Sequence, residues 1–276
     1  MTYLEFDFKV KPLAPGSDIL IAQLGEVGFE SFVEHDSGFL AYIPEKDFRD
    51  GLLKEIQLLS SSDFEIDWSS KTITQQNWNS EWEKNFHPIR VGNKCVVRAP
   101  FHEKEDVEYD IVIEPKMSFG TGHHETTHMM LEHILNHDFK NKSVLDMGCG
   151  TGILAILAEM RGANPIEAID IDNWCYLNSI ENVERNNCTH IKVYEGNSAL
   201  LEGKKFDVII ANINRNILLD DIPKYEQCLN ATGLLFLSGF YKSDLDMISS
   251  KCDAHSLQFN RNLERNNWIA AVYRKR

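Results

Sequence analysis

From about residue 91 onward the chain alternates short apolar, β-branched runs with helical patterns, and this alternation constrains its fold more than any other feature. Strands and helices in repeated alternation are typical of a doubly wound α/β domain, whose mostly parallel sheet is covered by helices on both faces. Two strand-like segments at the end of the chain predict an antiparallel hairpin on one edge of that sheet. The expected strands are 94–99, 109–114, 143–147, 166–171, 191–194, 206–212, 234–238, 256–260 and 268–274, and the expected helices are 126–137, 153–161, 174–186, 216–229 and 243–252.

Residues 1–73 carry a different order of patterns: strand, helix, strand, strand, helix, strand. The expected strands are 3–10, two within 30–43, and 64–73, and the expected helices run through 20–27 and 52–59. This order predicts a small α+β domain of the ferredoxin-like type, which is a common recognition scaffold. Since no catalytic constellation is evident there, we expect residues 1–73 to recognise a substrate.

Residues 74–90 are polar and carry Trp78, Trp82 and Phe86 at i, i+4 and i+8. This spacing puts three aromatic rings on one face of a helix, which must end before Pro88. We predict a linker helix that packs on the following domain; the alternative is a hinge or lid whose rings reach an active site. The expected organisation is therefore a domain over 1–73, a linker over 74–90 and a larger domain over 91–276.

The strongest local signal is the glycine-rich turn in 144–152, where Gly148, Gly150 and Gly152 separate a buried strand from an apolar helix. In an open α/β sheet this turn lies at the carboxyl end of the first strand, which is where ligands bind. Its G-x-G-x-G spacing differs from the G-x-G-x-x-G pattern of dinucleotide-binding proteins, because position 153 is Ile. The turn therefore predicts a nucleoside pocket of another kind.

Two acidic residues indicate the ligand. Asp146 lies two residues before Gly148, and a carboxylate pointing into the turn would repel a pyrophosphate and suit a sulfonium or ammonium cation. Asp170 ends the next strand, 22 residues after Gly148, at the usual place of a carboxylate that binds both ribose hydroxyls. Together with the glycine turn, the two acids predict a pocket for S-adenosylmethionine.

Asn212 ends the strand expected at 206–212, at the position where amino-methylating enzymes keep an asparagine. Its side-chain carbonyl can accept a hydrogen bond from a target amine, so we predict Asn212 to be a catalytic residue and a cofactor contact. A simple cap of the following helix is the alternative. The Pro-Pro-aromatic platform that would stack a flipped adenine is missing, which argues against a nucleobase substrate.

The segment 119–128, FGTGHHETTH, precedes the first helix of the larger domain. We expect its beginning to close over the methionine end of the cofactor, with contacts from Phe119, Gly120 and Thr121. The alternative is that Thr126 or Thr127 simply caps the helix. His124 and His128 have the i, i+4 spacing of a metal pair, but no third ligand is evident in the sequence, so no metal is expected.

The charge excludes one class of function and favours another. There are 28 basic and 42 acidic residues, giving a formal net charge of −14, which disfavours binding to a nucleic-acid backbone and suits a basic partner. No apolar run approaches the roughly 20 residues that span a bilayer, so no membrane association is expected. The six cysteines include no CxxC pair and favour a reducing cytoplasm.

Read together, these segments resemble the bacterial ribosomal protein L11 methyltransferases. The segments that carry the resemblance are WNSEWEKNFHPIRVG at 78–92, FGTG-x-H-x-TT at 119–127, VLDMGCGTGILAI at 144–156, AIDID at 168–172, ANI at 211–213 and LSGF at 237–240. The resemblance implies a class I methyltransferase domain with a Rossmann-like sheet, preceded by a ferredoxin-like domain and a linker helix. It also implies S-adenosylmethionine as cofactor, with contacts at Thr127, Gly148, Asp170 and Asn212, and N-methylation of lysine side chains and the N-terminal amine of L11.

The chain departs from this family at two places near the expected site. Glu125 stands where the family usually has proline, and Asn214-Arg215 replaces a more apolar pair. Three alternatives stay open: methylation of another protein or small amine, a nicotinamide-dependent oxidoreductase, and a nonenzymatic factor that binds a ribosomal protein. Ile153 and Asp146 argue against the oxidoreductase.

Overall fold

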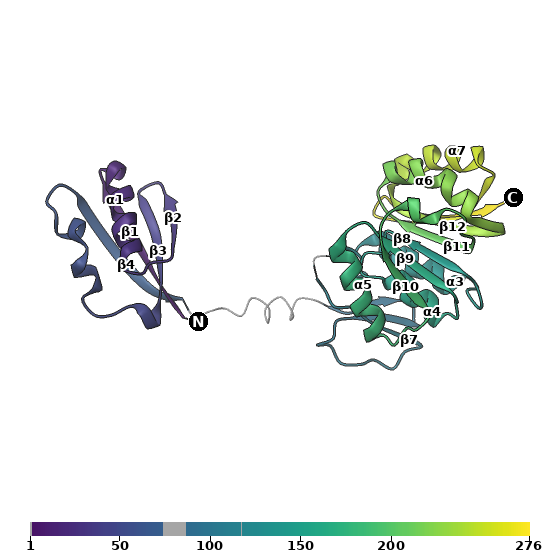
Figure 1. The fold of residues 1–276 in the computed structure, drawn as a ribbon, viewed down its shortest axis with the longest axis horizontal. Coiled ribbons are helices and arrows are strands. Elements are labelled where there is room, and N and C mark those ends of the chain that lie inside the picture. Colours follow the sequence, from purple (N-terminus) through teal and green to yellow (C-terminus); the bar gives the residue numbers. More distant parts are fainter. Residues whose placement is uncertain (1, 74–86, 117) are drawn as a thin grey trace. The chain divides into compact units, whose positions relative to one another are not determined.

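A computed structural model describes residues 2–73, 87–116 and 118–276. The chain divides into two compact units, Met1–Lys84 and Asn85–Arg276, each of which is described by itself (Figure 1). The predicted linker helix lies outside the described residues over 74–86, while Ile89–Val91, at the end of that predicted segment, forms strand β5. Among the described residues, no helix is both long and apolar enough to cross a membrane.

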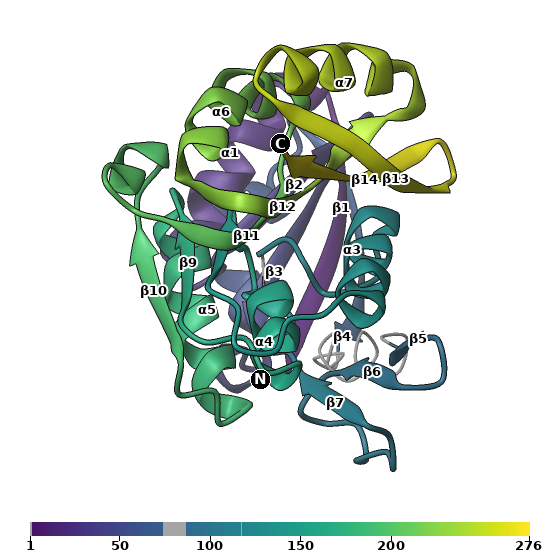
Figure 2. The same cartoon turned by 90° about the vertical axis from the view of Figure 1, so that its right-hand side faces the viewer.

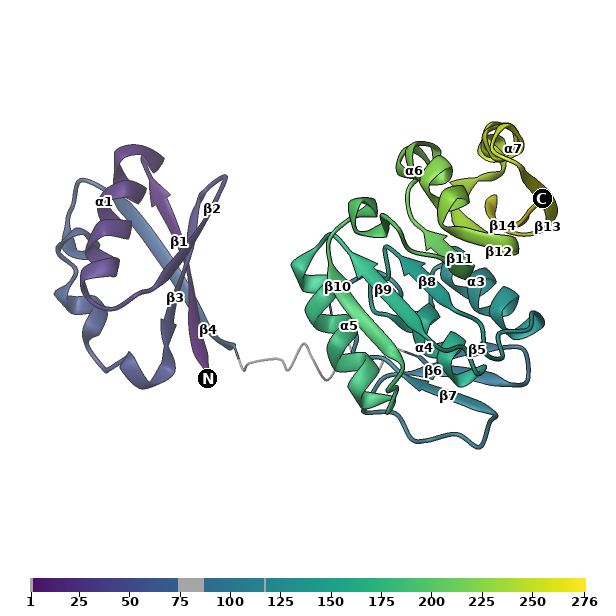
Figure 3. The ribbon, with the colours of Figure 1, turned by 45° about the vertical axis from the view of Figure 1, so that its right-hand side comes forward.

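The first unit is a four-stranded antiparallel sheet in the order β2-β3-β1-β4. Its elements are β1 (Tyr3–Lys11), α1 (Leu13–Glu26), β2 (Ser31–His35), β3 (Gly38–Pro44), η1 (Glu45–Asp47), η2 (Leu52–Glu55), η3 (Gln57–Ser60) and β4 (Glu65–Ile73). Helix α1 packs on one face of the sheet (Figure 3), where Leu20 and Leu24 meet Phe6, Phe8 and Phe39. This strand order and the helix position are those expected of a ferredoxin-like sheet.

The prediction of a regular helix over 52–59 was wrong. Two 3₁₀ turns, η2 and η3, stand there instead, because Ile56 between them has an extended backbone with φ −85° and ψ 108°. The apolar spacing that suggested a helix has another purpose: Leu52, Ile56 and Leu58 are buried in the domain core from these short turns. The spacing of apolar residues indicates which side chains are buried, but short 3₁₀ turns can bury the same side chains as a regular helix.

The second unit is built on a seven-stranded sheet in the order β10-β9-β8-β11-β12-β14-β13. Its strands are β8 (Val144–Met147), β9 (Ile166–Asp170), β10 (Ile191–Glu195), β11 (Phe206–Asn212), β12 (Leu229–Tyr241), β13 (Leu257–Arg265) and β14 (Trp268–Lys275). Strands β8 to β12 are parallel, whereas β14 pairs antiparallel with both β12 and β13. The predicted doubly wound sheet with an antiparallel edge hairpin is confirmed.

Helices cover both faces of this sheet because its strands alternate apolar residues toward two separate cores. On β11, Val208 and Ile210 pack in the core that holds α3 and α4, whereas Ile209 and Ala211 pack in the core that holds α6 and α7. Figure 2 shows these helix pairs on opposite sides of β11 and β12. The helices are α3 (Glu125–Asn136), α4 (Ile153–Met160), α5 (Asn173–Arg185), α6 (Arg215–Cys228) and α7 (Leu245–Ala254), with 3₁₀ turns η4 (Ser198–Leu201) and η5 (Lys242–Asp244).

A small sheet of β5, β6 (Cys95–Arg98) and β7 (Tyr109–Val112) is attached to α5 through asparagine side chains. The Asn186 amide accepts from the Val112 N–H at 2.8 Å and donates to the Val112 carbonyl at 2.7 Å. One turn earlier, Asn182 accepts from the Glu114 N–H at 2.9 Å. These bonds satisfy the free backbone edge of β7 and fix the chain that leads into the 119–128 segment.

Candidate active site at the carboxyl edge of the sheet

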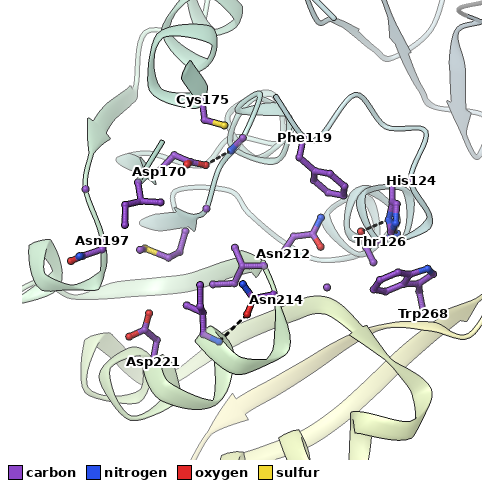
Figure 4. Close-up of a pocket in the computed structure, with 18 residues that line it drawn as sticks. Phe119, His124, Thr126, Asp170, Cys175, Asn197, Asn212, Asn214, Asp221 and Trp268 are labelled. Carbon is purple, nitrogen blue, oxygen red and sulfur yellow. Dashed lines mark hydrogen bonds between the residues drawn. The ribbon is translucent and has the colours of Figure 1, made fainter. Parts of the chain in front are cut away.

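A cavity of about 420 Å³ opens at the carboxyl ends of β8, β9 and β11 (Figure 4). Its size is within the ordinary range of small-molecule sites. Half of the predicted site residues line it, namely Phe119, Gly148, Gly150, Asp170 and Asn212. The other predicted residues are not among those that line it: Gly120, Thr121, Thr127, Asp146 and Gly152.

The glycine turn forms the floor of the cavity, and two of its positions accept no side chain. Gly148 has φ 71°, and a Cβ there would lie 2.1 Å from Cγ2 of Ile213. Gly150 has φ 56°, and a Cβ there would lie 2.3 Å from the carbonyl oxygen of Phe119. Glycine at these positions therefore lets the backbone itself border the ligand space.

Asp170 stands at the end of β9 with its carboxylate fixed from two sides. One oxygen accepts from the Gly150 N–H at 2.8 Å (Figure 4). The other accepts from the Asp172 N–H at 3.0 Å. The side chain lines the cavity although the residue is only 8% exposed. Each carboxylate oxygen accepts more than one hydrogen bond, so Asp170 retains acceptor capacity for a pair of hydroxyls.

Asp146 does not face the cavity, contrary to the expectation that its carboxylate points into the turn. It is fully buried beneath the turn, and one of its oxygens accepts from the Ala155 N–H of α4 at 3.0 Å. Burial raises the pKa of Asp146 to about 7. The reason is strand alternation: on β8, Asp146 shares the side of Val144, which packs toward α4. Its carboxyl therefore anchors the start of α4 from below.

The FGTG segment is attached to the glycine turn by two hydrogen bonds from Thr151. The Thr151 N–H donates to the Phe119 carbonyl at 3.0 Å, and its hydroxyl donates to the Gly120 carbonyl at 2.5 Å. These bonds hold the Phe119 ring at the cavity, where it is 52% exposed. Thr121 instead pairs with the His123 ring at 3.2 Å.

Asn212 lies in the middle of the cavity wall in Figure 4. Its amide nitrogen donates to the buried hydroxyl of Thr127 over 3.4 Å, while its Oδ1 is buried and has no partner among the described residues. A buried oxygen without a donor costs about 1–3 kcal/mol, which an N–H of a bound ligand would relieve. The capping alternative is excluded, because Asn214 caps α6 by accepting from the Ile217 N–H at 3.2 Å.

His124 has a capping role and a packing role. His124 caps α3 by accepting from the Thr126 N–H, which rules out the alternative that Thr126 or Thr127 is the cap. The His124 ring also packs edge-on against Trp268, with 4.8 Å between the ring centroids. Within the described ranges, no group of three or more His, Cys, Asp or Glu side chains has the arrangement of a metal site.

Sequence reasoning missed several residues of the cavity wall, above all Trp268 at the start of β14 and Asp221 on α6. Trp268 lies far along the chain from every motif and reaches the cavity through the pairing of β14 with β12. A tryptophan that begins the last strand of the chain was the available signal, but the direction of its side chain depends on the strand register. Asp221 accepts from the Ser198 hydroxyl at 2.7 Å, at the end of the cavity near Asn197 (Figure 4).

Comparison with known proteins agrees with this geometry. A family model described as Ribosomal protein L11 methyltransferase (PrmA) matches residues 22–276. The chain is similar to the ribosomal protein L11 methyltransferase of Bacteroides fragilis, with 48% identity over 278 residues and 99% of each chain covered. It is also similar to that of Porphyromonas gingivalis, with 43% identity over 280 residues, 98% of this chain and 97% of the relative.

A solved structure supports the same assignment. The ribosomal protein L11 methylase of Lactobacillus delbrueckii subsp. bulgaricus is 29% identical, with a TM-score of 0.65, and the match covers 69% of this chain and all of that one. The larger unit therefore has the Rossmann-like fold of class I methyltransferases, and its motifs stand around one cavity at the carboxyl edge of the sheet. The chain belongs to the ribosomal protein L11 methyltransferase family.

Proposed function

We propose that this S-adenosylmethionine-dependent methyltransferase methylates amines of ribosomal protein L11, on lysine side chains and on the N-terminal amine. The observation that carries the proposal is the Oδ1 of Asn212, which has no partner in the described part of the chain and is buried in the wall of a cavity that Asp170 also lines. Bound S-adenosylmethionine supplies an electrophilic methyl group on a sulfonium centre. In the proposal, Asp170 and the glycine turn bind the nucleoside, and Asn212 accepts from the incoming amine.

The apolar end of the cavity supports an amine substrate. Phe119 and Trp268 border it, and Asn212 lies between them and Asp170 (Figure 4). An amine must lose its proton to act as a nucleophile, which for a lysine of pKa about 10.4 costs about 4–5 kcal/mol at pH 7. Apolar surroundings lower the pKa of an amine, and a neighbouring positive charge lowers it further. A site that orients the amine through Asn212 alone would accept both lysine and α-amino groups.

The overall charge supports a basic protein as the substrate. A formal net charge of −14 attracts a basic partner and opposes binding to nucleic acid, which we propose the enzyme does not contact directly. All six cysteines are free, in keeping with a reducing compartment. Since ribosomal proteins are made and assembled in the cytoplasm, we propose that the enzyme acts there.

We further propose that residues 1–73 recognise the substrate protein and contribute nothing to cofactor binding, with 74–90 as the linker helix. Every described residue that lines the candidate site lies in the second unit. A chain that starts near Gln75 should therefore bind S-adenosylhomocysteine with unchanged affinity in calorimetry. Its kcat/KM for methylation of L11 should fall at least about tenfold, since a lost recognition surface removes binding energy of the order of 1.4 kcal/mol or more. Methylation of L11 at the full rate by this shortened chain would show that residues 1–73 have another role.

The proposed activity predicts a specific ligand response. S-adenosylhomocysteine at about 100 times its Kd should stabilise the protein by about 2.7 kcal/mol, raising Tm by several degrees, whereas NADH should leave Tm unchanged. Incubation with labelled S-adenosylmethionine and L11, followed by peptide mapping, should then place the label on amines. A response to NADH would favour the oxidoreductase, and a protein that responds to neither compound would be a nonenzymatic binding factor.

A further inference from the structure

We infer that Glu125 is a positioning residue, which holds the Trp268 indole at the mouth of the cavity through a hydrogen bond to Asn266. By fixing this wall, Glu125 sets how tightly the methyl-accepting polypeptide binds. The inference deepens the proposed function and rests on it for the nature of the substrate. The contact itself is independent of any substrate and can be tested in the protein alone.

Trp268 is held between two aromatic rings at the end of the cavity opposite Asp170. Its ring centroid lies 4.8 Å from that of His124 and 4.0 Å from that of Tyr241. Figure 4 shows the indole beside His124, with Phe119 at the same end of the cavity. Because Trp268 lines the cavity, a displacement of its indole changes the width of the space through which an amine approaches.

The backbone position of Trp268 is set by a two-residue hairpin turn. Asn266 and Asn267 have φ 48° and 65°, and Arg265 pairs with Trp268 directly across the turn. Two consecutive positive φ angles between paired strands are the mark of a type I′ turn, in which asparagine is favoured. Since Trp268 follows this turn immediately, the orientation of the turn determines where the indole lies.

One side chain from a distant part of the chain holds this turn. The Asn266 amide donates to Oε1 of Glu125 at 2.7 Å, joining residues 141 positions apart. The pKa of the Glu125 carboxyl lies below its usual value, mainly because of this hydrogen bond. Glu125 is the first residue of α3 and follows His124, whose ring contacts the indole. Two adjacent residues, the cap and the first residue of α3, therefore fix the indole ring and the turn.

The other side of the turn is held by the backbone. The N–H of Lys242 donates to the carbonyl of Asn267 at 2.8 Å, next to Tyr241 and its contact with the indole. This bond joins two backbone groups and would remain in any substitution of Glu125, so substitution of Glu125 removes only the contact on the other side of the turn. A proline at 125, which the family resemblance would lead one to expect, has no side-chain acceptor for Asn266.

The test removes the hydrogen bond between Asn266 and Glu125 by substituting either its acceptor or its donor. Glu125→Ala removes the acceptor, and Asn266→Gly removes the donor while keeping a residue that adopts positive φ. Each should raise the KM for L11 about three- to tenfold, the range for loss of one ordinary hydrogen bond, because solvent weakens this exposed contact. The value of kcat and the Kd for S-adenosylhomocysteine should stay within about twofold of wild type, because the residues that touch the cofactor are unchanged.

Three further variants distinguish positioning from a general loss of structure. Asn267→Gly changes the neighbouring turn residue without touching the Glu125 contact and should keep the wild-type KM. Glu125→Gln retains an acceptor oxygen and should restore KM to within about twofold of wild type. The double variant Glu125→Ala/Asn266→Gly should be no worse than either single variant, because both remove the same interaction.

A fluorescence measurement tests the contact without substrate. The emission of Trp268 is obtained by subtracting the signal of the matching protein that carries Trp268→Phe, and its quenching by acrylamide should increase in Glu125→Ala and Asn266→Gly. Equal KM values for Asn266→Gly and Asn267→Gly, or additive effects in the double variant, would overturn the inference. Failure of the proposed function would look different, since the wild-type protein itself would then transfer no methyl group to L11.

Discussion

Asn212→Ala is expected to lower the rate constant of methyl transfer about a hundredfold, if orientation of the amine supplies about 3 kcal/mol. The structural basis is the buried Oδ1 of Asn212, which has no donor among the described residues and borders the cavity. An interaction made mainly in the transition state changes kcat more than KM. Single-turnover methylation at saturating cofactor separates these two effects.

Two variants complete this experiment. Asn212→Asp keeps an acceptor oxygen but places a negative charge beside the developing ammonium, so its rate separates the hydrogen bond from the charge. Asn230→Ala is the matched control, because Asn230 donates to Asp207 near the amino end of β11, away from the cavity. We expect Asn230→Ala to keep the wild-type rate. If Asn212→Ala reacts at that rate with an intact fold, another residue orients the amine.

Asp170→Ala is expected to weaken cofactor binding about 10- to 150-fold, which corresponds to 1.5–3 kcal/mol for hydrogen bonds to a charged group. Its carboxylate accepts from two backbone N–H groups, those of Gly150 and Asp172, so alanine also leaves the glycine turn without its anchor. Asparagine should not restore binding, because its NH₂ group would face one of these N–H donors. Titration calorimetry with S-adenosylhomocysteine measures the loss.

The matched control for Asp170 is Asp172→Ser. Asp172 caps α5 by accepting from the Trp174 N–H at 2.9 Å, and serine retains that capping role while removing the nearby charge. A change of less than about threefold in affinity is expected, since a neighbouring exposed charge contributes under about 0.7 kcal/mol. Unchanged affinity in Asp170→Ala would contradict the ribose assignment, and equal losses in both variants would indicate a general effect of negative charge.

Much of the fold could be predicted from the sequence, because apolar residues recur in it with the period of the helix or strand that buries them. Strand β11 reads as a continuous apolar run since both its faces are covered, and its alternate residues enter two different cores. Prediction from apolar spacing failed at 52–59. The spacing there indicates which residues are buried, but it fits two short 3₁₀ turns as well as one helix. Helix α3 begins at Glu125, one residue earlier than expected, and its cap is His124, which accepts from the Thr126 N–H.

The part of the site that the sequence determined by itself is local. Gly148 and Gly150 are recognisable because their backbone conformations exclude side chains, and Asp170 and Asn212 are recognisable because they end strands whose carboxyl ends share one edge. Each of these inferences needs only a few neighbouring residues and the rules of an open parallel sheet. The neighbouring residues did not predict the direction of the Asp146 side chain, because that direction depends on which face of β8 packs against α4.

Only the tertiary structure decided how the other wall of the cavity is made. Trp268 reaches the cavity because β14 inserts between β12 and β13, and Glu125 meets Asn266 across 141 residues. Strand order and register are set by the packing of the whole sheet, and a shift of one residue would turn Trp268 to the other face. No local pattern encodes such a contact. The sequence therefore determined the side of the cavity that is proposed to bind the cofactor, and the tertiary structure decided the side that is proposed to face the amine.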